Sequence, residues 1–367
     1  MKQYNRITIL ITLFFMISVG INAREYQYFA GTYTRNSTSE GIYLFSINPE
    51  NKTSSIQYIQ KDIVNPSFLS FNAKKNLLYA ITETNDGSSA NAYTYNPKNQ
   101  STSFAGKVLL KGKGPCHITH TDRHLFIANY GSGSIDIVKL NQKGIPAEHV
   151  QLIQHTGSSI NSRRQSGPHA HQTVLSKDEK YLLCNDLGTD YTYCYAYDPT
   201  GQPCLKKCDS IKHEPGSGPR HLTISKDGKI IYLIQELTGV VSVLGFKNGQ
   251  FSLLQQSTVI TSQNGEASGA DIHLSPNEKN LYVSNRANYN NISAFKILPD
   301  KKIQLISQHE TTGKTPRNFS ITKDGKYLLA GNQNTHFITV FKILKDGILQ
   351  NTGMKVEIPA PVCLVER

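Results

Sequence analysis

The sequence has no tryptophan, three methionines and six cysteines, and charged residues make up 18% of its 367 residues. It also lacks any long stretch with an apolar residue at every third or fourth position, the pattern of an amphipathic helix. All-helical folds and folds of alternating strands and helices are therefore disfavoured. Tyrosine is abundant, with 19 residues. Together with many threonine, asparagine, serine and glycine residues, it is typical of strands and turns.

Several motifs of enzymes and metal proteins are missing. No Cys-x-x-Cys pair occurs with matching histidine spacing, which argues against a structural zinc site. No nucleophile-elbow motif surrounds a serine or cysteine, so a catalytic triad has little support. Disulfides form in exported proteins, and an export signal is predicted below. Cys204 and Cys208 are close enough in sequence for a bridge across a turn, although spacing alone does not establish one.

The positive charge is spread out rather than concentrated. The formal net charge is +12, and lysines such as Lys177, Lys226 and Lys323 are scattered among turns. No dense basic block with interleaved aromatic residues is present, so we expect a solvated basic surface and no nucleic-acid partner. Nothing in the sequence identifies a protein partner.

The first residues differ from the rest. Lys2 and Arg6 precede a mostly apolar run over 7–21, which is short for a membrane span of about 20 apolar residues. We predict a signal peptide over 1–23 and a mature protein over 24–367 that is exported across the inner membrane to the periplasm. No cysteine directly follows the run, which argues against a lipoprotein anchor. After cleavage no stable membrane insertion is expected; an uncleaved anchor is the alternative.

A unit of about 50 residues recurs seven times. Each unit has a polar turn, an apolar strand, a polar loop and a second apolar strand, as in 225–246 and 275–297. The first of these strands align on Tyr28, Leu78, Leu125, Leu182, Ile231, Leu281 and Leu328, at intervals of 50, 47, 57, 49, 50 and 47 residues. The pattern predicts an all-β fold, a seven-bladed β-propeller of four-stranded antiparallel blades around a central channel.

The end of the chain completes this ring in the prediction. The run over 356–365 has the pattern of a strand interrupted by Pro359 and Pro361. We expect it to complete the blade that begins near Tyr26, which would tie the two ends of the mature chain together.

Equivalent positions of successive repeats converge at the mouths of such a channel, so their residues can be compared directly. Just upstream of the aligned strands lie Ser67, Cys116, His171, Arg220, Ala270 and Arg317. The next residues along the chain are, in the same order, Phe68, His117, Gln172, His221, Asp271 and Asn318. At the far end of the aligned strands lie Tyr33, Glu83, Tyr130, Leu187, Glu236, Arg286 and Gln333. A purely structural repeat would place similar small or apolar residues there.

Three arginines near one channel point to an anionic ligand. Arg220, Arg286 and Arg317 repel each other unless a carboxylate or an anion offsets their charge. Arginine also pairs its donors with both oxygens of a carboxylate or phosphate. Glu236 is then the partner of these arginines, a catalytic group, or both. The alternative is a water-filled channel whose charges only form salt bridges between blades.

Two weaker features adjoin these positions. His169 and His171 would share one face of a strand, as in a metal site, but no third ligand is close in sequence and we expect no metal. The segment 157–167 contains Arg163 and Arg164 and accounts for the 57-residue interval. It is either a loop over the site or a plain surface insertion.

The motifs at these positions resemble a known family. Residues 218–221 read Gly-Pro-Arg-His, 270–273 read Ala-Asp-Ile-His and 316–318 read Pro-Arg-Asn. With Gln-Glu-Leu at 235–237 and Asn-Arg at 285–286, they are similar to the seven-bladed β-propeller lactonase family. That family includes the propeller-type 6-phosphogluconolactonase and is related to 3-carboxymuconate lactonizing enzyme. The similarity runs over nearly the whole mature chain.

The resemblance implies a site and a reaction. The family's pattern of a histidine in the fourth blade, an arginine and a glutamate in the fifth and an arginine in the sixth matches His171, Arg220, Glu236 and Arg286. It implies hydrolysis of a sugar-acid lactone, with His171 or Glu236 activating water, arginines stabilising negative charge, and no metal or organic cofactor. The predicted substrate-binding residues are Arg317, His221, His117, Asn318 and Gln333.

The predicted export signal bears on the substrate, because phosphorylated sugars are scarce outside the cytoplasm. An exported member of the family would act on an unphosphorylated aldonolactone or a uronic-acid lactone. Two other functions stay open from the sequence. One is a muconate-type lactonizing cycloisomerase, and the other is a non-catalytic propeller that binds a ligand or a protein.

Overall fold

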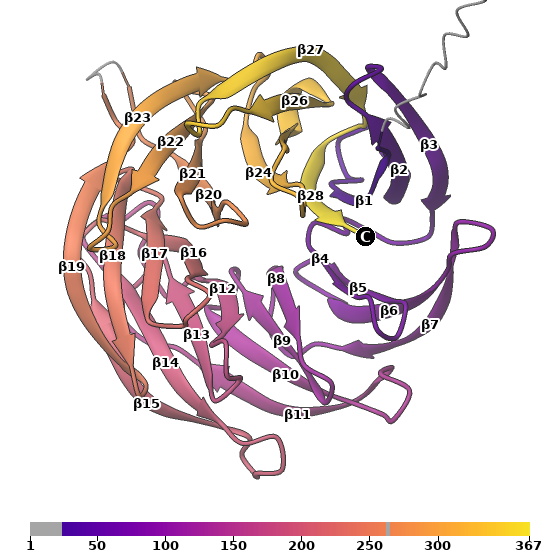
Figure 1. Ribbon diagram of the computed structural model, residues 1–367. Helices are drawn as coiled ribbons and strands as arrows, with labels where there is room; N and C mark the ends of the chain where they lie inside the picture. Colours follow the sequence, from indigo (N-terminus) through magenta and orange to yellow (C-terminus); the bar gives the residue numbers. More distant parts are fainter. Residues whose placement is uncertain (1–23, 262–264) are drawn as a thin grey trace, which may run out of the picture.

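Seven four-stranded antiparallel sheets surround one axis in the computed structural model, which describes residues 24–261 and 265–367 (Figure 1). The predicted seven-bladed β-propeller is therefore confirmed. The seven strands nearest the axis enclose the channel, and each blade runs outward from one of them (Figure 1).

The blades are numbered along the chain, with their strands given from the axis outward. Blades 1 to 4 consist of β28 (Pro361–Glu366), β1 (Tyr26–Thr32), β2 (Ile42–Asn48), β3 (Thr53–Gln60); β4 (Leu69–Asn72), β5 (Leu77–Thr82), β6 (Ser89–Asn96), β7 (Ser101–Leu109); β8 (Pro115–His120), β9 (His124–Asn129), β10 (Ser134–Leu140), β11 (Pro146–Gln154); and β12 (Ala170–Leu175), β13 (Tyr181–Asp186), β14 (Tyr191–Tyr197), β15 (Leu205–Lys212).

Blades 5 to 7 repeat the same order. They consist of β16 (Pro219–Ile224), β17 (Ile230–Gln235), β18 (Val240–Lys247), β19 (Gln250–Thr258); β20 (Gly269–Leu274), β21 (Asn280–Asn285), β22 (Asn291–Ile297), β23 (Ile303–Glu310); and β24 (Pro316–Ile321), β25 (Tyr327–Asn332), β26 (Phe337–Ile343), β27 (Leu349–Glu357). A short 3₁₀ turn, η1 (Gln333–Thr335), follows β25.

The strands aligned in the sequence are the second strand of each blade, and the strands paired with them are the third. Both are buried on both faces by neighbouring blades, so they have nearly continuous apolar runs such as β17. The innermost strands lie one strand earlier. They carry polar residues toward the channel, as β12 and β16 do, and therefore have no apolar run to align.

The two ends of the described chain meet in blade 1. Strand β28 pairs antiparallel with β1, with Phe29 opposite Val365 and Ala30 opposite Leu364. The predicted closure is confirmed, with one correction to its bounds. The run over 356–365 is divided between two strands, because β27 ends at Glu357 and β28 begins at Pro361. Pro359 between them has no N–H to donate to a sheet.

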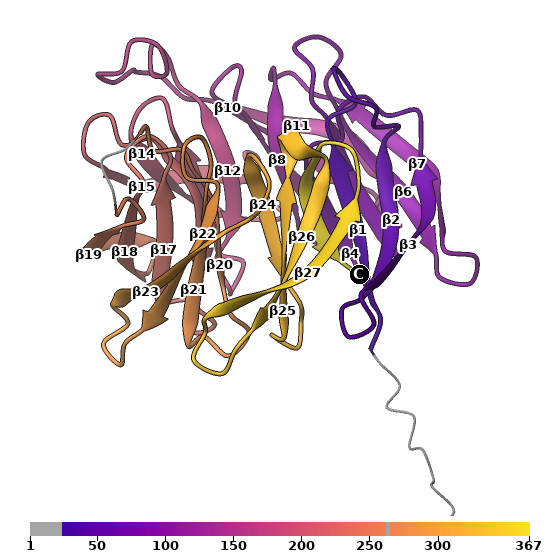
Figure 2. The same cartoon turned by 90° about the horizontal axis from the view of Figure 1, so that it is seen from above.

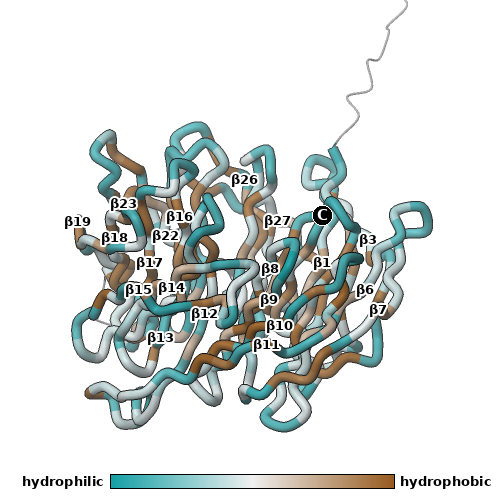
Figure 3. The backbone as a smooth tube through the Cα atoms, turned by 90° about the horizontal axis from the view of Figure 1, so that it is seen from below, coloured by the Kyte–Doolittle hydropathy of each residue, from teal (hydrophilic) through white to brown (hydrophobic). Residues whose placement is uncertain are grey.

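Apolar side chains fill the spaces between blades. One cluster joins blades 1 and 7 and includes Tyr28, Phe45, Leu329, Val340 and Leu364, all buried. Figure 2 shows the blades from the side, and Figure 3 shows hydrophobic strands between hydrophilic loops at the two ends of the ring. The loops at these ends are therefore available for a site, while the strands form the core.

The predicted signal peptide and the cysteines can be compared with the described part of the chain. The predicted signal peptide, residues 1–23, lies outside the described residues. Within 24–261 and 265–367, no helix has the length and apolar character needed to cross a membrane. All six cysteines are free. Cys208 Sγ lies 3.3 Å from Cys194 Sγ, not beside Cys204, whose thiol donates to Gln151 Oε1.

Candidate active site

A cavity of about 410 Å³ opens at one mouth of the channel. At this mouth the innermost strands begin and the second strands end, because consecutive strands of a blade are antiparallel. Both sets of positions compared in the sequence therefore meet here. The titratable residues lining the cavity are Glu83, Cys116, Tyr130, Arg164, His171, Glu236, Arg286 and Arg317.

Irregular strand starts carry several of these residues. In blades 3, 4, 5 and 7 the pairing of the innermost strand with the second strand shifts at its second residue, which is Cys116, His171, Arg220 or Arg317. A β-bulge leaves one residue outside the ladder and re-aims its side chain. Proline begins β8, β16 and β24, where no ladder N–H is required.

Glu236, just after β17, is surrounded by arginines. Its Oε2 lies 2.8 Å from Nε of Arg220 and 3.1 Å from an Nη of Arg286, and its Oε1 lies 2.6 Å from Arg164. The Glu236 side chain is only 5% exposed. Burial alone would raise the pKa of this carboxyl, but Arg286, Arg220 and Arg164 hold it well below its usual range. Glu236 is therefore ionised, and both of its carboxylate oxygens contact arginines.

The guanidinium groups of the cluster are also held by the backbone. Arg220 donates to the carbonyl of Ala270 at 2.6 Å, and Arg286 donates to the carbonyls of Ser268 and Gly269 at 3.3 Å. Burial and the charge of Arg286 lower the pKa of Arg220, and the Glu236 carboxylate opposes this shift. Arginine retains its charge in proteins, so the cluster keeps fixed positive donors at the cavity.

The polar segment after β11 brings Arg164 to the cavity. Its neighbour Gln165 is buried and donates to Asp190 at 2.7 Å. Asp190 also accepts from the backbone N–H groups of Gly216 and Gly218, both at 2.7 Å. One buried carboxylate thus anchors both the segment that carries Arg164 and the turn that leads to Arg220. Of the two alternatives for 157–167, the structure supports the loop at the site.

On the other side of the ring, Arg317 lies near a second carboxylate. Its guanidinium carbon is 5.5 Å from the centre of the Tyr33 ring. Tyr33 donates its hydroxyl to Glu83 Oε1 at 3.2 Å, and Ser67 donates to Glu83 Oε2. Among the ion pairs of residues 24–261 and 265–367, none includes Arg317 or Glu83. Of the arginines that line the cavity, Arg317 is therefore the one without an ion-pair partner among the described residues.

Two histidines, His171 and His221, line a small space next to the cavity together with Arg220 and Arg317. The His171 ring is 5.1 Å from the ring of His221, and burial and the charge of Arg220 lower the pKa of His171 well below its usual value. His221 Nδ1 lies 2.8 Å from Asp271, which also accepts from the amide of Asn318. His117 lies against His221, with ring centres 5.8 Å apart. Burial lowers the pKa of His221 to about 4.

Most of the predicted site residues are brought together. His171, Glu236, Arg286 and Arg317 line the cavity, and Arg220, His221 and Asn318 line a small space beneath it. His117 packs deeper, against the Phe68 ring. Like His117, Gln333 is in neither lining formed by the described residues. It begins η1 instead of extending β25. The catalytic and binding roles of these residues stay predictions.

Other residues of the site were not selected from the sequence. Glu83 and Tyr130 are at the compared positions and line the cavity. The residues at equivalent positions of other repeats did not predict that these two would be part of the site. Asp190 lies in a turn outside those positions, and only its hydrogen bonds distinguish it. Of the two histidines that were considered as metal ligands, with no metal expected, His171 lines the cavity. His169 donates to the carbonyl of Tyr130 at 2.8 Å and stacks on its ring. Among the described residues, no group of three metal-binding side chains is present.

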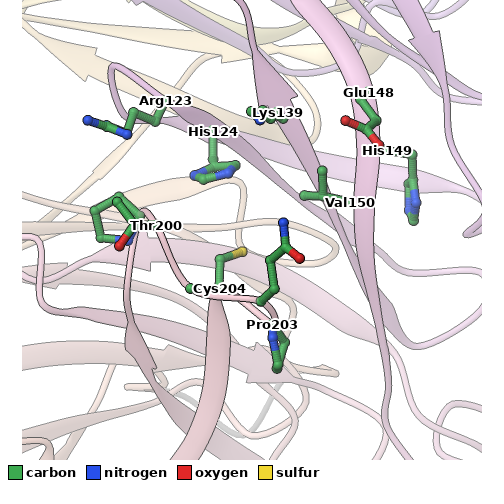
Figure 4. A pocket seen from close by; sticks show the side chains of 12 residues that line it. Arg123, His124, Lys139, Glu148, His149, Val150, Thr200, Pro203 and Cys204 are labelled. Carbon is green, nitrogen blue, oxygen red and sulfur yellow. The ribbon is translucent and has the colours of Figure 1, made fainter.

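A second hollow lies between blades 3 and 4, away from the channel (Figure 4). Its volume is about 590 Å³, and its lining includes Arg123, His124, Lys139, Glu148 and Thr200. It shares no residue with the channel cavity. Its arginine and its glutamate are exposed, in contrast to the buried pairs around Glu236.

Comparisons with known proteins agree with this architecture. A family model described as "Lactonase, 7-bladed beta-propeller" matches residues 27–366. A 6-phosphogluconolactonase of Formosa agariphila is 30% identical over 86% of this chain and 91% of its own, and one of Bacillus subtilis is 28% identical over 93% and 98%.

Solved structures extend the similarity. A putative 6-phosphogluconolactonase of Bacteroides fragilis superposes with a TM-score of 0.89 and 31% identity, covering 94% of this chain and 98% of its own. A periplasmic gluconolactonase of Pseudomonas aeruginosa has a TM-score of 0.85 and 28% identity, covering 94% and 99%. The similarity thus includes the whole ring.

Proposed function

Because this chain belongs to the lactonase family of seven-bladed β-propellers and is a lactone-hydrolysing enzyme, we propose that it opens the lactone of an acidic sugar in the channel cavity. Charge carries this proposal: the arginines of the cavity and the space beneath it outnumber the glutamates by four to two. Unmatched positive charge in a recessed site favours a ligand that brings negative charge. A volume of about 410 Å³ suits one sugar-sized molecule.

Two arginines have different roles in this proposal. Arg317, free of a carboxylate ion pair within the described chain, binds the carboxylate or phosphate of the substrate. Arg286 is fixed by two carbonyls and by Glu236, and it stabilises the negative charge that builds on the lactone oxygen when water attacks. Preorganised donors of this kind require no reorganisation during the reaction.

The geometry also bears on the two groups that the sequence suggested as the base. Glu236 is held ionised by three arginines and is better suited to be their counter-ion. His171 is neutral, but burial and the positive charge of Arg220 make it a weak base. Neither has the proton affinity that general-base catalysis near neutral pH favours.

The predicted signal peptide and the relatives support a proposal for the substrate and the location. Two relatives are named for a phosphorylated lactone, and a structural neighbour is a periplasmic gluconolactonase. We place this enzyme in the periplasm. The substrate proposed there is an unphosphorylated uronolactone, which supplies the carboxylate that Arg317 would bind. An unphosphorylated aldonolactone, which is neutral, is the alternative.

A substrate panel tests the proposal. Purified protein lacking residues 1–23 is assayed with a uronolactone, glucono-δ-lactone and 6-phosphogluconolactone, with acid release followed at constant pH against spontaneous opening. NMR of the products separates hydrolysis from cycloisomerisation of a muconate-type acid. Opening of all three at background rates would overturn the proposal.

Variants locate the reaction within the molecule. Arg317→Ala should raise KM at least about tenfold for a charged lactone, because a charged hydrogen bond contributes about 1.5–3 kcal/mol. It should change KM less than about threefold for neutral glucono-δ-lactone. Arg123→Ala, at the exposed second hollow, is the matched control and should change neither (Figure 4). Equal effects on charged and neutral substrates would contradict the role of Arg317.

A further inference from the structure

The cavity has a second carboxylate whose surroundings differ from those of Glu236. Glu83 follows β5 in blade 2, three blades around the ring from Glu236 and Arg220 of blade 5. Its two oxygens accept hydrogen bonds from the hydroxyls of Tyr33 and Ser67. Both donors are uncharged: burial raises the pKa of Tyr33, which keeps that hydroxyl protonated. Glu83 is therefore oriented by neutral groups instead of being bound by cations.

The charges that face Glu83 come from several blades. Arg317 of blade 7 and Arg220 of blade 5 favour its ionised form, as do the hydrogen bonds from Tyr33 and Ser67. The thiol of Cys116, in blade 3, faces it as well. Burial outweighs these contributions and raises the pKa of Glu83 above its ordinary value. A carboxylate with increased proton affinity accepts protons more readily than one held by three arginines.

We propose that Glu83 is the catalytic base of the lactone hydrolysis proposed above. One lone pair of the water oxygen forms a bond to the ring carbonyl carbon, and Glu83 takes a proton from that water. When the intermediate collapses, the ring C–O bond breaks and protonated Glu83 gives its proton to the departing ring oxygen. The product is the open hydroxy acid, which releases its carboxyl proton to solvent. No other reactant is required.

Tyr33 and Ser67 act through Glu83 as positioning residues. Each hydroxyl stabilises the ionised carboxylate by donating to it. Loss of either donor should therefore raise the pKa of Glu83 further. The rate falls as pH decreases through the pKa of a base that must be ionised, so the acidic limb of the kcat/KM profile should move to higher pH in Tyr33→Phe.

The test compares Glu83→Gln, Tyr33→Phe and wild type on a lactone that wild type opens. Glu83→Gln should lower kcat at least about 100-fold with KM within about threefold, since general-base catalysis contributes 10²–10⁴-fold. Glu148→Gln makes the same chemical change on the exposed edge strand β11 and should keep wild-type kinetics. Circular dichroism and thermal melting establish that each variant is folded.

A second readout serves if Glu83→Gln fails to fold. Tyr33→Phe keeps the carboxylate, and its acidic limb should lie above that of wild type. If Glu83→Gln retains wild-type kcat, or Tyr33→Phe leaves the acidic limb unmoved, the role of Glu83 is overturned while lactone hydrolysis stands. If wild type opens no lactone, the proposed function fails, and the role of Glu83 fails with it.

Discussion

Replacing Glu236 with glutamine should destabilise the folded protein strongly, because this one carboxylate is the ion-pair partner of three arginines. The substitution keeps the shape of the side chain and removes its charge. Arg220 is 1% exposed and Arg286 11% exposed in their side chains, whereas Arg164 is 39% exposed. Two of the three cations would therefore lose their counter-ion where water can replace it only in part.

The magnitude follows from the two buried pairs. Removing one partner of a buried ion pair typically costs about 3–5 kcal/mol. The Arg220 and Arg286 pairs share one oxygen of Glu236, so their contributions do not simply add. The more exposed Arg164 pair contributes at most about 1 kcal/mol. We therefore expect Glu236→Gln to lower the free energy of unfolding by about 3–5 kcal/mol at pH 7.

Urea denaturation of wild type and Glu236→Gln, followed by circular dichroism at several pH values, measures this difference. The pKa of Glu236 is lowered in the folded state from an ordinary value of 4.5. Its contribution is therefore fully present above about pH 4.5 and is lost as pH falls toward the folded-state pKa. The difference between the two proteins should be constant from pH 8 to pH 6 and shrink below pH 4.5.

The control is Glu148→Gln, an exposed change that should lie within about 0.5 kcal/mol of wild type. Phosphate should stabilise Glu236→Gln more than wild type, since an added anion can replace the missing carboxylate. A loss below about 1 kcal/mol at pH 7, or a loss independent of pH down to pH 3, would refute the view that Glu236 is the counter-ion of the cluster.

Three further outcomes are expected. Asp190→Ala should lower the melting temperature and raise KM, because Asp190 anchors both Gln165 and the turn before Arg220; unchanged kinetics would contradict this role. Deleting 361–367 should abolish the cooperative thermal transition, because blade 1 loses its innermost strand; a normal melting curve would argue against closure by β28. Mild oxidation with glutathione disulfide should link Cys194 to Cys208, whose sulfurs are 3.3 Å apart, and peptide mass spectrometry would show a Cys204–Cys208 bridge if this is wrong.

The ring was predictable from the sequence because each blade repeats the same physical requirement. Second and third strands are covered on both faces, so they carry apolar runs at regular spacing, as β17 and β18 do. The innermost strands escaped direct alignment because the channel accepts polar side chains. Even so, comparing positions relative to the apolar strands predicted that Arg220 and Arg317 lie near one channel, and both line the small space beneath the cavity.

The site was predictable only where residues occupy repeated positions. Glu236 and Arg286 do so, and both line the cavity. Arg164 reaches Glu236 from an insertion that no other blade has, so no repeat could reveal its contact. The properties of Glu83 depend on burial and on hydroxyls from two other parts of the chain. Such properties arise from tertiary packing and leave no pattern in the sequence.

The pairing of β28 with β1 also sets the sequence separation that folding must bridge. Blade 1 joins β28 to β1, whereas each of blades 2 to 7 is built from one contiguous stretch of the described chain. Contacts between segments far apart in the sequence cost more loop-closure entropy than hairpins and slow folding. Blade 1 also separates blade 7, which carries Arg317, from blade 2, which carries Glu83. The placement of these two side chains across the cavity therefore depends on a contact between the two ends of the described chain.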